Sequence, residues 1–160
     1  MEEILAYRQA LLSALLEVVD ELAKTVTAIP TQAWYISSSP DSHTPHFTLA
    51  HLRELEAQVF ARNLQRIQAE DGPGLPLFDD EAWMARHYQP HEAVQNILNE
   101  LARMRKQEVS WLRDLPAASW SLTGRHPRVG VRTLQWWVEL QLDTSRQHVR
   151  QITSSLASAT

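Results

Sequence analysis

The stretch from Gly124 to Ile152 reads GRHPRVGVRTLQWWVELQLDTSRQHVRQI and joins a glycine-framed turn to a long helical segment. Thr133 is placed to cap that helix, because its hydroxyl can accept a hydrogen bond from a free amide of the first turn. Four residues then recur at steps of four, three and four and so share one helix face: Trp137, Gln141, Thr144 and His148. The face begins aromatic and turns polar. Buried polar groups cost free energy unless they are paired, so this face is expected to meet water, another side chain, a ligand or a metal.

Outward from this helix, glycines and prolines divide the chain into long uninterrupted windows. Four windows contain neither residue, and each carries apolar side chains at helical spacing. They predict helices over about 3–29, 48–70, 91–115 and 133–156, with a short helix near 79–88. Thr48 is the predicted cap of the second long helix, and Pro90 the predicted first-turn residue of the third.

Strand signals are nearly absent, because no alternating run of β-branched residues lies between turn pairs. Four amphipathic helices of similar length in one chain are typical of a helix bundle. The fold is therefore predicted to be all-α, with a single domain over residues 1–160. This domain is a four-helix bundle with a short extra helix in the connection between its second and third long helices.

The composition narrows the classes of protein further. With 160 residues, 44% of them hydrophobic, the chain can bury a sizeable core. A formal charge of −4 gives no electrostatic reason to expect nucleic-acid binding. The absence of cysteine excludes disulfides and zinc–thiolate sites. The acidic N-terminus lacks the pattern of a secretory signal, and no apolar run has membrane-spanning length, so a cytoplasmic protein without a membrane partner is expected.

Two of the seven histidines stand apart from the others. His51 and His148 each lie inside a long predicted helix, near the boundary between its polar and apolar faces. Others, such as His43 and His46, fall in or beside loops, where exposed histidines without a role are expected. Imidazole is a common ligand of zinc, nickel and iron. Since the residue four before His148 is Thr144, a poor ligand for these metals, spacing alone favours a hydrogen-bonded histidine pair over a metal site.

Other catalytic motifs are not found in the sequence. It contains no phosphate-binding glycine loop, no GxSxG nucleophile turn and no HExxH helix. Glu54 and Glu56 are expected to lie on a solvated helix face, with partners on the helix surface, and not to form an acid/base pair. Catalytic residues are therefore left unassigned.

The tryptophans in and beside the predicted helices exceed what one bundle core needs. Apolar patches on the surface of a soluble protein often mark contacts between subunits. We therefore expect a homodimer formed through a helix face that carries Trp136 or Trp111.

Three segments of the chain resemble the DinB-like superfamily. They are FTLAHLRELE at 47–56, PLFDDEAW at 76–83, and the stretch from Gly124 to Ile152 with its HVRQI ending. The resemblance implies a four-helix bundle with an unusual connection order, often assembled as a homodimer. Many members hold a divalent metal, typically nickel, zinc or iron, with three histidines. Characterised relatives include bacillithiol- and mycothiol-dependent transferases and isomerases.

Carried over by position, the first family histidine falls on His51 and the last on His148. The middle one falls on Thr144, so the metal site that the resemblance implies is degenerate. Two histidines, completed by water or by a carboxylate such as Glu56, would hold a divalent metal weakly or not at all.

Two functions remain open from the sequence, and whether the chain is an enzyme is not decided. The favoured one is a small-molecule-binding or non-catalytic relative, whose pocket uses Trp137, Gln141 and Thr144 beside the two histidines. The alternative is a metal-dependent S-transferase of the bacillithiol or mycothiol type, or a hydrolase, in which the metal activates a thiol or water.

Overall fold

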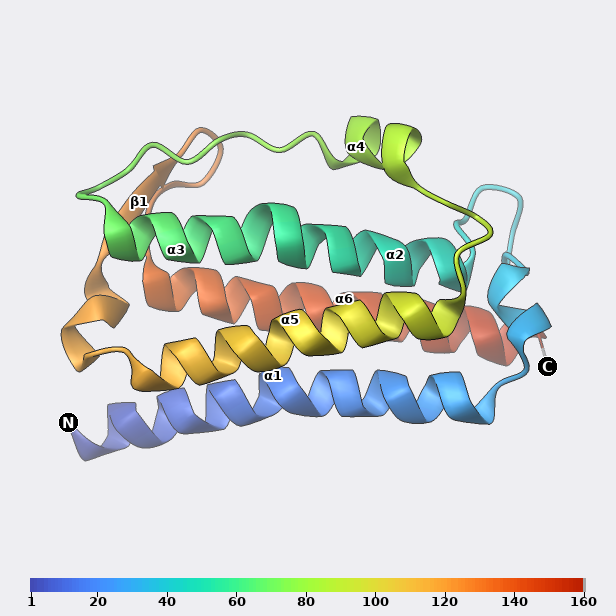
Figure 1. Ribbon diagram of the computed structural model, residues 1–160, viewed down its shortest axis with the longest axis horizontal. Helices are drawn as coiled ribbons and strands as arrows, with labels where there is room; N and C mark the ends of the chain where they lie inside the picture. Colours follow the sequence, from blue (N-terminus) through green and yellow to red (C-terminus); the bar gives the residue numbers. More distant parts are fainter. Residues whose placement is uncertain (160) are drawn as a thin grey trace.

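The computed structural model describes residues 1–159, and most of them are helical (Figure 1). The elements in chain order are α1 (Glu2–Ala28), η1 (Thr31–Tyr35), α2 (Pro45–Leu55), η2 (Glu56–Phe60), α3 (Ala61–Ala69), α4 (Asp80–His87), α5 (Val94–Asp114), η3 (Ala117–Ser121), β1 (Thr123–His126), β2 (Gly130–Thr133) and α6 (Leu134–Ala159). The segments α2, η2 and α3 follow one another without a break and form one long helix. The predicted all-α fold is confirmed, and so is the short extra helix, which is α4.

The four long helices lie along the bundle with an uncommon order of directions. In Figure 1, α1 and α6 run one way, whereas α2–α3 and α5 run the other. α1 packs chiefly against α5 and α6, and α2 packs against the same two helices. The neighbours α2 and α5 are therefore parallel. The chain between them, residues 70–93, must return along the whole bundle, and it carries α4 on the way.

Two helices start within a few residues of the predicted positions, but the residues predicted to open them are wrong. α2 begins at Pro45, and its cap is Thr44, whose Oγ1 accepts from the amide of Phe47 at 3.1 Å. Proline is tolerated at the first helical position because its missing amide would be unpaired there. Thr48 is therefore not the cap.

The third long helix, α5, begins at Val94, and Pro90 lies in the turn before it. The carbonyl of Glu92 accepts from Nε2 of His46 at 2.7 Å, so a tertiary contact holds this turn. The predicted cap of α6 is confirmed, since Thr133 Oγ1 accepts from the amide of Trp136 at 3.1 Å.

A small hairpin precedes α6, where the sequence indicated only a turn. β1 and β2 pair antiparallel, with Gly124 opposite Arg132, and Gly130 adopts a φ of 74° that favours glycine. The outer edge of β1 also binds the return segment. Arg125 donates its amide to the carbonyl of Pro73 at 2.8 Å, and its carbonyl accepts from Leu75 at 2.7 Å. The hairpin thus fastens the start of the long return to the end of the bundle.

Replacing Gly124 by Ala is expected to lower the free energy of unfolding by about 1–3 kcal/mol. A Cβ at this position would lie 2.9 Å from Cγ1 of Ile67 and 2.9 Å from Cδ1 of Leu75. Both side chains are buried, so they can move little. Gly74→Ala is the matched control, because a Cβ there meets no atom of the described residues within 4 Å. Urea unfolding followed by circular dichroism measures both variants, and equal stability of the two would contradict the packing argument.

The long second helix widens into one π turn at η2. The amide of Ala61 donates to the carbonyl of Glu56, five residues earlier, instead of four as in an α-helix. Such turns insert one extra residue and change which side chains face inward. Here Glu56 and Phe60 are buried, whereas Leu55 and Val59 are only partly buried.

A buried ion pair crosses the bundle core at this turn. The guanidinium of Arg105 donates to both carboxylate oxygens of Glu56 at 2.8 Å each, and the two residues are 0% and 1% exposed. The same guanidinium also donates to the carbonyl of Leu15 at 3.0 Å and to Oγ of Ser145 at 2.9 Å. Residues from all four long helices therefore meet at Arg105. The prediction that Glu56 lies on the helix surface is wrong.

A second carboxylate, Glu108, lies in the same cluster. The side-chain amide of Gln141 donates to Oε1 of Glu56 at 2.8 Å and also to Oε2 of Glu108. Burial, and then repulsion by Glu56, raise the pKa of Glu108 well above its ordinary value. Burial alone would raise the pKa of Glu56 as well, but Arg105 lowers it below its ordinary value. The two shifts therefore run in opposite directions: Arg105 favours the charged form of Glu56, whereas burial favours the protonated form of Glu108.

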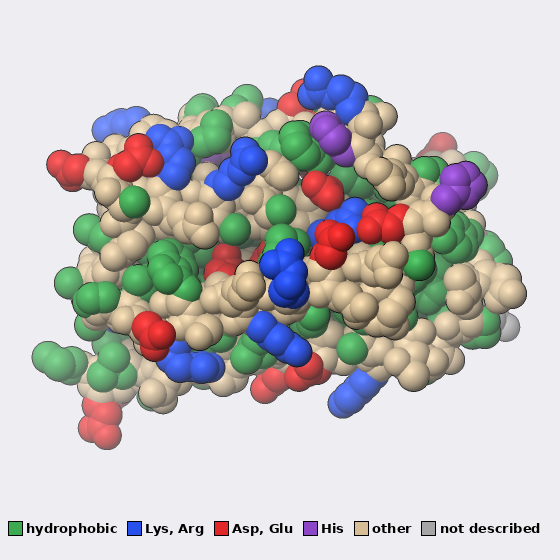
Figure 2. All heavy atoms as spheres, in the orientation of Figure 1, with side chains coloured by type: hydrophobic (Ala, Val, Ile, Leu, Met, Phe, Trp, Pro, Cys, Tyr) green, Lys and Arg blue, Asp and Glu red, His purple; other side chains and the backbone are tan. Residues whose placement is uncertain are grey.

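The outer surface carries charges of both signs. Figure 2 shows acidic and basic side chains interspersed on the face drawn there, in keeping with the small net charge of −4. Trp136 and Trp111 are partly buried against the core, and the guanidinium of Arg132 lies 5.0 Å from the ring of Trp136. The homodimer stays a prediction. Among the described residues, the helices lack the combination of length and apolar character that crossing a bilayer requires.

Candidate functional site

The two histidines singled out in the sequence face each other across the seam between α2 and α6. Nδ1 of His51 lies 3.1 Å from Nε2 of His148, although the two residues are 97 positions apart in the chain. Their ring centroids are 5.0 Å apart. His148 is buried, and the side chain of His51 is 23% exposed. The pair thus lies at the edge of the core, where a small molecule can reach His51.

Each ring is held by its outer nitrogen. Nε2 of His51 lies 2.8 Å from Oδ2 of Asp80, the first residue of α4. Nδ1 of His148 lies 2.8 Å from the backbone carbonyl of Thr144, one turn earlier on α6. A carbonyl and a carboxylate both accept hydrogen bonds, so both outer nitrogens carry hydrogen.

This arrangement leaves the inner nitrogens to share one cation. Burial lowers the pKa of His148, so its ring is neutral at neutral pH and its Nε2 presents a lone pair. Nδ1 of His51, with its proton on the opposite nitrogen, would present a second lone pair. Two lone pairs at 3.1 Å repel each other unless a positive species lies between them. That species is either a proton shared between the two rings or a metal ion.

The geometry fits part of a metal centre. Two nitrogens at 2.0–2.1 Å from a tetrahedral zinc ion are about 3.3 Å apart, close to the spacing found here. Histidine ligands also commonly donate their second nitrogen to a carboxylate or a carbonyl, as both do here. However, among residues 1–159 no three His, Asp or Glu side chains are grouped so that they could hold a metal ion. The residues present supply two ligands and do not complete a three-histidine site.

Glu56, considered as a replacement ligand in the sequence, is not placed for that role. Both of its oxygens accept from Arg105, and one accepts from Gln141 as well. Thr144 lies one turn from His148 and contributes its carbonyl to the pair. Its hydroxyl is a weak metal ligand, so the third position remains without a suitable donor.

Asp80 is the site residue that the sequence did not single out. The structure separates the roles of Asp79 and Asp80. Oδ1 of Asp79 accepts from the amide of Ala82 at 3.0 Å and caps α4, which leaves Asp80 for His51. Asp80 comes 29 positions after His51, beyond the end of the second long helix and the loop that follows it, so no local spacing links the two residues.

A recess beside this pair, here called the histidine recess, is lined by His43, Phe47, His51, Asp80, Glu81, Met84, Ala85 and Tyr88. Its volume is about 680 Å³, and apolar side chains alternate with a few polar ones, as is usual for small-molecule sites. Tyr88 is held by His46, whose Nδ1 accepts from the tyrosine hydroxyl at 2.6 Å. His46 is fully buried, so its assignment to the surface was wrong.

The other predicted pocket residues lie in different places. Trp137 is buried and, with Asp80, lines a cavity of about 190 Å³ on the other side of the aspartate. Within the described residues, the indole nitrogen of Trp137 has no hydrogen-bond partner. Gln141 donates into the cluster around Glu56 and Glu108. Thr144 alone of the three lies directly at the histidine pair, through its carbonyl.

Comparison with known proteins agrees with this architecture. The family model of the DinB superfamily matches residues 14–152. A solved structure, YfiT from Bacillus subtilis, is similar with a TM-score of 0.83 and 19% sequence identity, over 92% of this chain and 85% of that chain. YfiT is described as "a probable metal-dependent hydrolase with an unusual four-helix bundle topology". No curated protein matches the chain. At 19% identity the structural likeness concerns the fold, whereas the family model covers most of the sequence, and by that match the chain belongs to the DinB superfamily.

Proposed function

We propose that this protein binds a small molecule in the histidine recess and that its metal centre is degenerate, so that a divalent metal is held weakly. One observation carries the proposal: the imidazole nitrogens of His51 and His148 lie 3.1 Å apart, and Thr144 stands where the family has its middle histidine. The outer nitrogen of each ring has a hydrogen-bond partner, so the rings are held with their inner nitrogens oriented to bind a cation. With two protein ligands, most of the coordination sphere of a metal would be water, and its affinity would be low.

Thr144→His is expected to restore a three-nitrogen site. The wild type should bind zinc or nickel at well under one equivalent, whereas the variant should bind about one. A metal that binds only the folded state stabilises it, by about 2.7 kcal/mol at a hundredfold excess over the dissociation constant. The variant should therefore melt higher with metal present than without it. Metal titration of protein without a histidine tag, followed by thermal melts, measures both effects.

Thr144→Ala is the matched control for this experiment. It removes the hydroxyl, adds no ligand and keeps the carbonyl that accepts from His148. Its metal binding should equal that of the wild type. Tight, stoichiometric binding by the wild type would reject the degenerate site, because another group would then complete it. An absence of any gain in Thr144→His would show that this position does not reach the pair.

The second candidate is a metal-dependent hydrolase or thiol-dependent S-transferase, and the two fixed histidines favour it. YfiT is described as a probable metal-dependent hydrolase. When bound, a metal would lower the pKa of a water or thiol ligand. The residues of this chain would then orient the site, with Asp80 and the carbonyl of Thr144 fixing the two rings. Stoichiometric metal in the wild type would favour this candidate over the first.

A further inference from the structure

The histidine recess lies between one face of α2 and one face of α4. Phe47 and His51 are one turn apart on α2. Glu81, Met84 and Tyr88 recur at steps of three and four on α4 and at the residue that ends it, so they share a helix face. All five side chains line the recess. A ligand bound there therefore lies between the two helices.

Two contacts join these walls and give the recess two different ends. At one end, Nε2 of His51 lies 2.8 Å from Oδ2 of Asp80, the first residue of α4. At the other end, the rings of Phe47 and Tyr88 meet edge to face, with their centroids 4.8 Å apart. Because His51 follows Phe47 by four residues, the two ends are about 6 Å apart along α2. One small ligand can therefore reach both ends.

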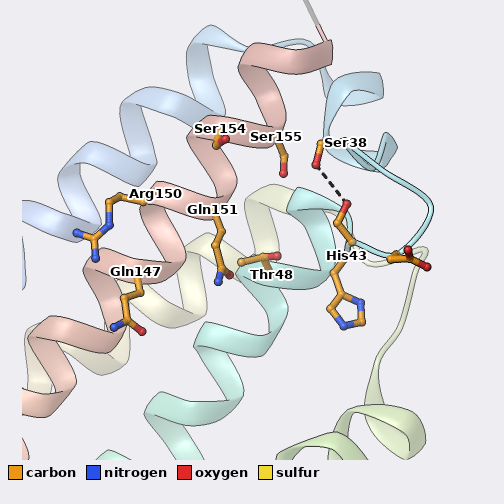
Figure 3. Close-up of a pocket in the computed structure, with 10 residues that line it drawn as sticks. Ser38, His43, Thr48, Gln147, Arg150, Gln151, Ser154 and Ser155 are labelled. Carbon is orange, nitrogen blue, oxygen red and sulfur yellow. Dashed lines mark hydrogen bonds between the residues drawn. The ribbon is translucent and has the colours of Figure 1, made fainter.

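The end at Phe47 is aromatic. The ring of His43 stacks on Phe47 with the centroids 4.0 Å apart. Figure 3 shows this imidazole ring pointing away from Ser38, toward the side of the molecule on which α4 lies. Phe47 and Tyr88 are only partly buried, and Met84, one turn before Tyr88, adds an apolar thioether to the wall. This end suits an apolar group, above all another aromatic ring.

The end at His51 carries negative charge. Asp80 and Glu81 both line the recess, whereas none of the arginines and lysines in the described part of the chain does. The charge of Asp80 is balanced by the cation that His51 shares with His148. Glu81 takes part in no ion pair or side-chain hydrogen bond among residues 1–159. One negative charge at this end is thus left without a partner.

We propose that the histidine recess selects a small arylalkyl amine, with its ammonium group at the end formed by Asp80 and Glu81 and its aromatic ring between Phe47 and Tyr88. The ammonium supplies the positive charge that Glu81 lacks, and the ring packs on the aromatic end. An anionic ligand would meet Glu81 without a basic side chain to offset it. This inference rests on the proposed function, because it names the class of ligand for that same recess.

Titration calorimetry with three compounds of one shape tests the choice of charge. They are phenethylamine, 2-phenylethanol and 3-phenylpropionate, which carry the same ring and a positive, a neutral and a negative head. Wild-type protein at pH 7 should bind the amine about threefold to fivefold more tightly than the alcohol, the usual range for an ion pair with an exposed carboxylate. The carboxylate compound should bind most weakly.

Two variants separate the ends of the recess. Glu81→Gln should remove most of the preference for the amine and leave binding of 2-phenylethanol unchanged. Phe47→Ala should weaken the amine and the alcohol by the same factor, because both lose the aromatic contact. Asp20→Asn makes the same change of charge as Glu81→Gln at an exposed position on α1, outside the recess. It should bind all three compounds like the wild type.

Equal binding of phenethylamine and 2-phenylethanol, or tightest binding of 3-phenylpropionate, would overturn the inference. The proposed function would then stand, since the recess would still bind a small molecule. An equal loss of amine binding in Glu81→Gln and Asp20→Asn would also overturn it, because the effect would then come from net charge alone. So would the absence of binding by all three compounds at millimolar concentration. Metal titration of Thr144→His uses none of these compounds and tests the degenerate metal centre separately.

Discussion

Arg105→Leu should lower the free energy of unfolding by about 3–5 kcal/mol, the usual cost of leaving one member of a buried ion pair without its partner. Without Arg105, burial would raise the pKa of Glu56, so its carboxyl would either stay charged without a partner or take up a proton. The carbonyl of Leu15 and the hydroxyl of Ser145 would also lose their donor. Domains of this kind are stable by only about 5–15 kcal/mol, so the loss would be a large part of the total. Urea unfolding followed by circular dichroism measures it.

Two further variants separate the ion pair from simple loss of an arginine. Arg103→Leu changes an exposed arginine two residues away on the same helix, and its effect should stay within about 0.5 kcal/mol. Adding Glu56→Gln to Arg105→Leu removes the unpaired charge and should recover part of the lost stability. If Arg105→Leu were as stable as Arg103→Leu, the buried cluster would not contribute to holding the four helices together.

The stability of the wild type should fall as the pH rises above about 4.3, the ordinary value for glutamate, because of Glu108. The pKa of Glu108 is raised in the folded protein, so the folded state binds this proton more tightly than the unfolded state does. The stabilisation that this proton gives is complete below the pKa of Glu108 in the unfolded chain. It is lost as the pH rises through the pKa of Glu108 in the folded protein. Within that window the loss is about 1.4 kcal/mol for each pH unit.

Glu108→Gln should remove this dependence, since glutamine stays neutral at every pH. The difference in stability between the variant and the wild type should therefore grow in favour of the variant as the pH rises. Glu17→Gln, an exposed position on α1, is the control and should follow the wild-type curve. Glu56 acts in the opposite direction: its lowered pKa means that its contribution is lost only as the pH falls below about 4.3. Parallel curves for the wild type and Glu108→Gln would show that Glu108 does not hold a proton in the folded state.

The helices could be predicted because they depend on local spacing, whereas His51 and His148 were brought together by the resemblance to the DinB-like superfamily. Glycine and proline interrupt helices for reasons of backbone geometry alone, so the windows between them gave the bundle. His51 and His148 stood out because each lies at the edge of an apolar stripe. Asp80 could not be found in this way, because its meeting with His51 depends on where the long return places α4. The hairpin was missed for a similar reason, since β1 also pairs with the return segment at Leu75.

The second long helix shows where regular spacing misleads. Leu52 and Phe60 are both buried although they are eight residues apart. In a straight α-helix, the side chains of two such residues point about 80° apart around the helix axis. The π turn takes up this difference with one extra residue. A reading with a constant period instead selects Leu55 and Val59, which are only partly buried. Glu56 is four residues after the buried Leu52 and so shares its helix face, but its charge indicated the surface, because no local signal announces Arg105, 49 positions further on.

The order of the helices has a consequence for how the chain folds during synthesis. Since α1 packs chiefly against α5 and α6, its first long-helix partner is made late. Arg105 lies 90 positions beyond Leu15, whose carbonyl it binds. At the usual pace of translation, that delay is on the order of 5–20 s. A bundle built from helical hairpins can pack its first two helices at once, whereas this chain must close loops across most of its length first, which slows folding. Until α5 has left the ribosome, the apolar face of α1 therefore stays exposed to solvent.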